Sequence, residues 1–245
     1  MFKEKVVLVT GSSRSLGKEI IKKFANEGAK VVINYNNSLE EANQLKKEFA
    51  DLSIENLIVK CDVSKEEEVK EMVKTIVDTY GKIDILVNNA GICNDTLFDK
   101  KTKDDFEKVI GVNLIGTYLV SKYVGEIMLK QKSGKIINIA SDNGLHECYP
   151  ESCDYDSSKA GVISLTHNMA KYYAPYINVN AICPGWIDTD MNKDLTKEQK
   201  EEINKNILLE RFASKEEIAD VVLFLASNKA SYVNDSIITV NGGVK

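Results

Sequence analysis

The stretch TGSSRSLG, Thr10–Gly17, lies between an apolar run and a helical pattern, and it decides the fold class of this chain. The apolar run KVVLV covers residues 5–9, and the amphipathic segment KEIIKKFANEG covers residues 18–28. A glycine-containing turn between a strand and a helix collects backbone N–H groups and the positive end of the helix dipole, which together suit a pyrophosphate. Gly11 is expected to make the sharp turn and Gly17 to let the helix pack closely. The stretch therefore predicts a dinucleotide site after the first strand.

The same strand–helix alternation continues along the whole chain. Runs rich in Val and Ile occur at 30–34, 56–63, 83–88, 135–140, 177–183 and 236–240. Helices are expected between them, including one at about 104–130 and one at about 153–173, and capping-box spacings occur at Ser38/Glu41, Ser64/Glu67 and Ser214/Glu217. Strands without polar alternation are buried on both faces, as in a parallel sheet. The prediction is an α/β fold: a single Rossmann-type doubly wound parallel sheet with helices on both faces, forming one NAD(P)-binding domain over residues 1–245.

Composition and charge exclude several classes of protein. A net charge of −5 argues against a nucleic-acid partner, because such proteins carry a basic face. No apolar run approaches the roughly 18 residues of a membrane span, and the first ten residues lead straight into a strand, so we expect a cytoplasmic protein with no membrane contact. The five cysteines are an odd number without disulfide or zinc spacing, so no metal site is expected.

The type of dinucleotide is indicated by the end of the second strand, VINYNNS. NAD sites usually carry an acid there, which accepts from the ribose 2′-hydroxyl, but the first acid in this chain is Glu40, inside the next helix. Arg14 and Arg211 are the only arginines, and one of them stands in the candidate phosphate turn. Arginine presents a fork of donors that matches phosphate. With Asn34, Tyr35, Asn36 and Ser38 nearby, Arg14 predicts NADP(H).

Four further motifs occur in a fixed order at predicted strand ends. They are NNAG at 88–91, Ser141, the pair Tyr155 and Lys159, and PGWIDTDM at 184–191. With TGSSRSLG, these motifs make the chain resemble the short-chain dehydrogenase/reductase family over essentially its whole length. Tyr155 and Lys159 are four residues apart and would share one helix face. An ammonium group there is expected to lower the pKa of the tyrosine, which suits a general acid for carbonyl reduction.

The resemblance implies a role for each matching residue. Tyr155 would protonate the carbonyl oxygen, Lys159 would hold the nicotinamide ribose, Ser141 would polarise the carbonyl, and Asn113 would anchor a water in the proton relay. The cofactor-binding residues implied are those of the first turn (Gly11, Ser13, Arg14, Ser15, Leu16, Gly17), the second strand end (Asn34, Tyr35, Asn36), the adenine side (Asp62, Val63), the ribose side (Asn89, Ala90, Gly91, with Tyr155 and Lys159) and the nicotinamide side (Pro184, Gly185, Ile187, Thr189).

This chain departs from the family pattern at three places. Ser15 stands where the family has a glycine, and Asp235 replaces another glycine near the C-terminus. The loop DNGLHECYPESCD, residues 142–154, is acidic and one residue longer than in similar sequences. Because this loop borders the predicted substrate site, the substrate is the least determined part of the prediction.

Within the family, the chain most resembles 3-oxoacyl-[acyl-carrier-protein] reductases, which implies NADPH-dependent reduction of a 3-oxoacyl thioester in fatty acid biosynthesis. A reductase or dehydrogenase of a sugar, polyol, steroid or other small carbonyl is the alternative, and a non-catalytic NADP(H)-binding protein is a remote one. The partner would be a small-molecule or carrier-protein-bound substrate. The resemblance also implies a homotetramer and a substrate lid at about 189–206.

Overall fold

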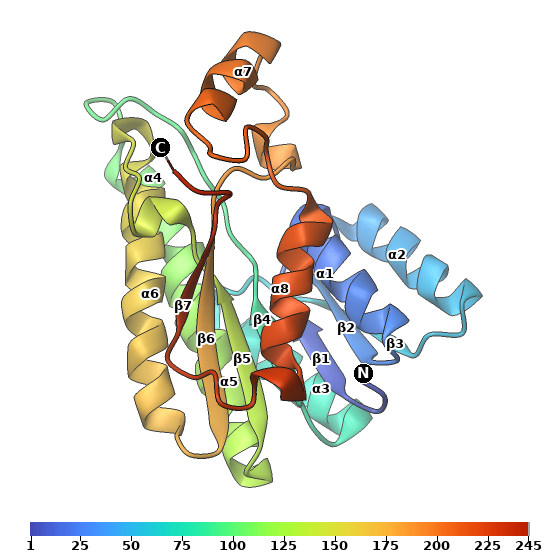
Figure 1. The fold of residues 1–245 in the computed structure, drawn as a ribbon. Coiled ribbons are helices and arrows are strands. Elements are labelled where there is room, and N and C mark those ends of the chain that lie inside the picture. Colours follow the sequence, from blue (N-terminus) through green and yellow to red (C-terminus); the bar gives the residue numbers. More distant parts are fainter. Residues whose placement is uncertain (245) are drawn as a thin grey trace.

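The computed structural model describes residues 1–244, apart from the side chain of Met191. Within these residues, seven parallel strands form one sheet in the order β3-β2-β1-β4-β5-β6-β7 (Figure 1). The strands are β1 (Val6–Val9), β2 (Lys30–Tyr35), β3 (Asn56–Lys60), β4 (Ile85–Asn88), β5 (Gly134–Ile139), β6 (Ile177–Pro184) and β7 (Ile237–Val240). The predicted Rossmann-type parallel sheet is confirmed.

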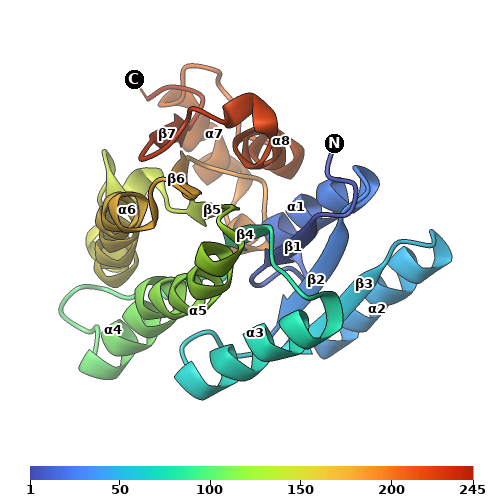
Figure 2. The same ribbon diagram turned by 90° about the horizontal axis from the view of Figure 1, so that it is seen from below.

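Helices cover both faces of the sheet (Figure 2). They are α1 (Ser15–Asn26), α2 (Leu39–Asp51), α3 (Glu66–Tyr80), α4 (Lys103–Ile110), α5 (Gly116–Gln131), α6 (Cys153–Tyr173), α7 (Lys197–Lys205) and α8 (Lys215–Ala226). One core joins α1, α2 and α8 to strand residues such as Val7 and Val9, and a second joins α3, α5 and α6 to Val6 and Leu8. Neighbouring strand residues point to opposite faces, so both must be apolar.

The order of the strands places the site. The chain leaves β1 toward β2 and β3, then returns to β4 on the other side of β1, so the connections diverge between β1 and β4. Ligands of such sheets bind outside the carboxyl ends of the strands at this switch point. No described helix is both long and apolar enough to cross a membrane.

Helix ends follow the sequence only in part. The capping box of Ser214 and Glu217 forms at α8, as predicted, and Gly81 closes α3 in the left-handed conformation. The other two predicted capping boxes are wrong. The Ser38 side chain makes no cap bond at α2, and α3 is capped by Lys65 because the Ser64 hydroxyl donates to Asp62 instead. The helix expected at 104–130 is interrupted by a π-helical turn, Gly111–Ile115, between α4 and α5.

Candidate active site

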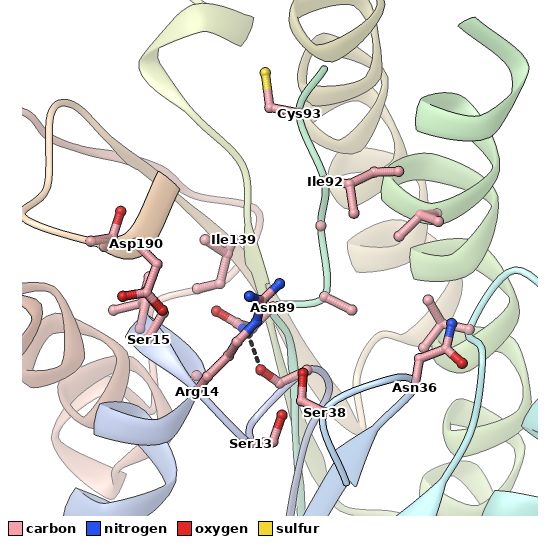
Figure 3. Close-up of a pocket in the computed structure, with 18 of the residues that line it drawn as sticks. Ser13, Arg14, Ser15, Asn36, Ser38, Asn89, Ile92, Cys93, Ile139 and Asp190 are labelled. Carbon is pink, nitrogen blue, oxygen red and sulfur yellow. Dashed lines mark hydrogen bonds between the residues drawn. The ribbon is translucent and has the colours of Figure 1, made fainter. Parts of the chain in front are cut away.

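A pocket lies at the carboxyl ends of the strands and has a volume of about 510 Å³, within the usual range for a small-molecule or cofactor site. Every cofactor-binding residue predicted from the sequence lines it, from Gly11 through Thr189, and so do Ser141, Tyr155 and Lys159. Asn113 is the one predicted site residue that does not. Figure 3 shows Arg14, Ser13 and Ser38 in the lower part of the pocket and Cys93 at its upper end. The pocket therefore extends from the phosphate turn to the Ile92–Cys93 segment.

The turn after β1 is fixed by two glycines and an asparagine. Gly11 has φ +63°, the left-handed region that favours glycine, and its N–H donates to Asn34 Oδ1 at 2.9 Å. A Cβ at Gly17 would lie 2.4 Å from the Gly11 carbonyl oxygen, so only glycine fits there. Its side-chain-free backbone keeps the N-terminus of α1 close to the turn. The arrangement fits a pyrophosphate of a dinucleotide.

The motif after β4 is tied to the same turn. Thr10 Oγ1 accepts from the backbone N–H groups of Asn89 and Ala90, both at 3.0 Å, and Asn89 Nδ2 donates to the Thr10 carbonyl at 2.8 Å. These bonds join the ends of β1 and β4, which are adjacent strands. The two predicted cofactor segments therefore form one rigid edge.

Ser15 occupies a strained backbone position. It is the first residue of α1 and has φ +51°, which costs a residue with a Cβ about 1–2 kcal/mol. This is where the family pattern has glycine, and the structure supplies the reason for that glycine. Asp235, the other departure, likewise has φ +57°, and it contacts His167 Nδ1 at 2.5 Å.

Replacing Ser15 by glycine is expected to stabilise the protein. Glycine at this position removes the left-handed strain of about 1–2 kcal/mol. It also loses more conformational entropy on folding, which costs about 0.5–1 kcal/mol. The free energy of unfolding should therefore rise by about 0.5 kcal/mol. Urea denaturation measures the difference. Ser13→Gly is the matched control, because Ser13 lies in the same turn without a positive φ, and it should destabilise. A Ser15→Gly variant that is no more stable than Ser13→Gly would contradict the claim that the backbone of Ser15 is strained.

At the adenosine end, the side chain of Asn34, predicted to contact the cofactor, is bonded within the protein instead. Asn34 is buried, with 1% of its surface exposed, and its amide nitrogen donates to the carbonyls of Val59 and Cys61. Since its oxygen accepts from Gly11, Asn34 shapes the turn and has no free donor for a phosphate. Arg14, Tyr35, Asn36 and Ser38 remain at this end, and no carboxylate of β2 is among the lining residues.

At the catalytic end, α6 places Tyr155 and Lys159 on one face as predicted. Lys159 Nζ lies 5.4 Å from the Tyr155 ring centroid and donates to the Ile139 carbonyl at 2.7 Å. Burial lowers the pKa of Lys159 to about 8. Burial also raises the pKa of Tyr155 well above its ordinary value, and a hydrogen bond with Ser141 offsets this only in part. The expected lowering of the Tyr155 pKa is therefore wrong for this structure, because desolvation of the phenolate outweighs the neighbouring ammonium.

Asn113 lies one layer behind the pocket wall, in the π-helical turn. Its Oδ1 accepts from the Ile92 N–H at 2.8 Å, and its Nδ2 donates to the Ile92 carbonyl at 2.9 Å and to Ser158 Oγ at 3.0 Å. The side chain predicted to hold a water thus bonds the chain after β4 and the second turn of α6. Its implied part in a proton relay stays a prediction.

Sequence reasoning missed several lining residues and one buried organiser. Ile92, Cys93 and Val112 also line the pocket, as do Asp190, Asn192 and Lys193 from the segment predicted as a lid. Asp156, one residue after Tyr155, accepts from Asn143 Nδ2, the Tyr149 N–H and Ser152 Oγ at 2.8–3.0 Å, and so holds the long loop 142–154. Their only signal in the sequence was that they adjoin motif residues.

Comparisons with known proteins agree with this geometry. Residues 11–245 match the sequence family described as enoyl-(acyl carrier protein) reductase. The chain is 40% identical over 241 residues to 3-oxoacyl-[acyl-carrier-protein] reductase FabG of Staphylococcus epidermidis, covering 98% of each chain, and 41% identical to the 3-oxoacyl-[acyl-carrier-protein] reductase of a Synechocystis strain, covering 98% of this chain and 96% of that one.

Two solved structures resemble it closely. Levodione reductase superposes with a TM-score of 0.94 at 34% identity, covering 99% of this chain and 98% of the other. Gluconate 5-dehydrogenase of Burkholderia cenocepacia, in complex with NADP and tartrate, superposes with a TM-score of 0.93 at 31% identity, covering 99% and 95%. Both the motifs in the pocket and these relatives lead to the same conclusion. The chain belongs to the short-chain dehydrogenase/reductase family and is an oxidoreductase that uses a nicotinamide cofactor.

Proposed function

We propose that the protein is an NADPH-dependent reductase of 3-oxoacyl thioesters, the substrate class of 3-oxoacyl-[acyl-carrier-protein] reductases. The observation that carries the substrate class is the identity of 40% over nearly the whole length of a curated reductase of this kind. The preference for NADPH is supported by Arg14 and by the absence of a β2 carboxylate from the pocket lining. The homotetramer, the cytoplasmic location and the movement of a lid at 189–206 stay predictions.

The catalytic end supplies the parts that carbonyl reduction requires. A nicotinamide cofactor held along this pocket would supply a hydride to the carbonyl carbon. Tyr155, whose pKa is raised by burial, stays protonated at neutral pH and donates its proton to the developing alkoxide oxygen. Ser141 lies beside the phenol and donates a hydrogen bond to the same oxygen, which stabilises its charge. The Lys159 ammonium favours the phenolate that the transfer leaves behind.

A second candidate is reduction of a small cyclic or polyhydroxylated carbonyl compound. It is favoured by the likeness to levodione reductase and gluconate 5-dehydrogenase. The loop 142–154 also carries two acids at the substrate side, the partly exposed Glu147 and the exposed Glu151, and these would repel an acidic carrier protein.

Oxidation of NADPH with acetoacetyl-CoA, a soluble surrogate for the carrier-bound thioester, tests the proposal. Turnover with acetoacetyl-CoA at a kcat/KM well above that with a cyclic diketone or a keto-sugar acid supports the thioester. Turnover only with the small carbonyl compounds contradicts the thioester as substrate and supports the second candidate, while the assignment as a reductase stands. NADPH binding without turnover of any of them contradicts both.

Replacing Arg14 by leucine is expected to raise the KM for NADPH by about 10–100-fold, because a charged hydrogen bond contributes about 1.5–3 kcal/mol and each 1.4 kcal/mol is tenfold. The KM for NADH should stay unchanged, since NADH has no 2′-phosphate. Steady-state kinetics with both cofactors measure this. Arg211→Leu is the control, because Arg211 pairs with Glu217 on the surface. An equal rise in KM for NADPH and for NADH would show that Arg14 does not bind the 2′-phosphate.

A further inference from the structure

The upper wall of the pocket is a segment without regular structure. Residues 92–102 connect β4 to α4, and no helix or strand forms within them. Ile92 and Cys93 of this segment line the same pocket as Ser141, Tyr155 and Lys159. Asn113 fixes the first of these residues through both backbone groups of Ile92. Something else must fix the remainder, because an irregular chain is otherwise free to move.

A buried ion pair supplies that fixation. Lys101 Nζ donates to Asp154 Oδ1 and to the Asn94 carbonyl, each at 2.7 Å. The two side chains are 3% and 0% exposed, and among the ion pairs of residues 1–244 no other has both partners buried. Lys101 therefore bonds both its own segment, at Asn94, and the first turn of α6, at Asp154.

The pair ends directly on the catalytic residue. Asp154 Oδ1, which accepts from Lys101, also accepts from the backbone N–H of Tyr155 at 2.9 Å. A second fastening lies beside it, where the Thr96 N–H donates to the Glu151 carbonyl at 3.0 Å. The segment that begins at Ile92–Cys93 and the first turn of α6 are therefore connected through the Lys101 ammonium group, with the Thr96–Glu151 bond beside it. Asp154 Oδ2 is buried without a partner, so the carboxylate depends on Lys101 for its compensation.

We propose that Lys101 and Asp154 are positioning residues, which set the distance between Tyr155 and the Ile92–Cys93 wall and so the place of the substrate carbonyl between them. A shift of about 1 Å in such a contact lowers a rate by about 10²-fold, because proton transfer requires a near-attack geometry. The cofactor end is held separately by Thr10, Asn34 and Asn89. The pair therefore acts on the carbonyl and leaves NADPH affinity unchanged.

The kinetic part of the test rests on the reductase activity, and the labelling part does not. Lys101→Met and Asp154→Asn each remove one charge and leave the other buried and unpaired. Each is expected to lower kcat by at least about tenfold with the KM for NADPH unchanged, and to raise the alkylation rate of Cys93 by iodoacetamide, resolved by mass spectrometry. The double variant removes the unpaired charge but restores no bond between the wall and α6, so its kcat and Cys93 labelling should match those of the single variants instead of adding their losses.

Lys103→Met is the matched control, because Lys103 lies two residues away in an exposed pair with Glu107. It should change neither kcat nor labelling. Asp154→Glu keeps the charge pair but lengthens it by one methylene, so it should fold with a near-parent melting temperature and still show a lower kcat. Parent kcat and Cys93 labelling in a folded Asp154→Glu, or recovery of both values in the double variant, would overturn the proposal. If no carbonyl compound is turned over by the parent, the thioester proposal fails, while the labelling still decides for or against the positioning.

Discussion

Replacing Tyr155 by phenylalanine is expected to lower kcat for carbonyl reduction by about 10²–10⁴-fold, the usual contribution of a positioned general acid. The phenyl ring keeps the packing of α6 against the pocket and removes only the proton donor. The affinity for NADPH, measured by fluorescence titration, should change little, because the phosphate turn and the Asn89–Gly91 segment are untouched. The melting temperature should stay near that of the parent protein.

Tyr149→Phe is the matched control for this variant. Tyr149 lies on the loop that borders the substrate side, and its hydroxyl donates to Glu147 at 3.1 Å, but it does not line the pocket. It should keep kcat within about twofold, since it moves no proton in the proposed reaction. A Tyr155→Phe protein with kcat close to that of the control would remove Tyr155 as the acid.

Replacing Lys159 by methionine is expected to lower kcat/KM by about 10²-fold or more, because the charge that favours the phenolate of Tyr155 is lost. Methionine fills a similar volume without a buried charge, so the fold should be kept. The parent protein should show an alkaline limb in kcat near pH 8, since burial lowers the pKa of Lys159 to about 8 and the ammonium is present below that pH and lost above it. The variant should lack this limb.

The pH profile separates Lys159 from other groups in the pocket. The raised pKa of Tyr155 keeps the phenol protonated throughout the same range, so it adds no second limb. Lys135→Met is the control, because Lys135 is a partly buried lysine at the other end of β5, bonded to Asn178 at 2.9 Å. It should keep the parent profile. An alkaline limb that persists in Lys159→Met would assign the titration to another group.

The sequence predicted the fold and most of the pocket because these depend on local patterns. Continuous apolar runs predict strands buried on both faces, and the helical pattern after Cys153 has the same bounds in the structure, Cys153–Tyr173. Each motif except the pair Tyr155 and Lys159, which lies in α6, stands at or just after the end of a strand. The carboxyl ends of parallel strands meet at one edge, so residues far apart in the chain, such as Gly11, Asn89 and Ser141, were bound to line one pocket.

Pairings between side chains, in contrast, were settled by packing. Ser64 has the spacing of a helix cap, but its hydroxyl donates to Asp62, and Asn34 points its amide into the protein rather than toward a phosphate. The pKa of Tyr155 follows its burial and not its spacing from Lys159. Lys101 and Asp154, 53 residues apart, carry no shared motif. Strand and helix patterns are written into neighbouring residues, whereas desolvation and the choice among hydrogen-bond partners exist only once distant segments have packed together.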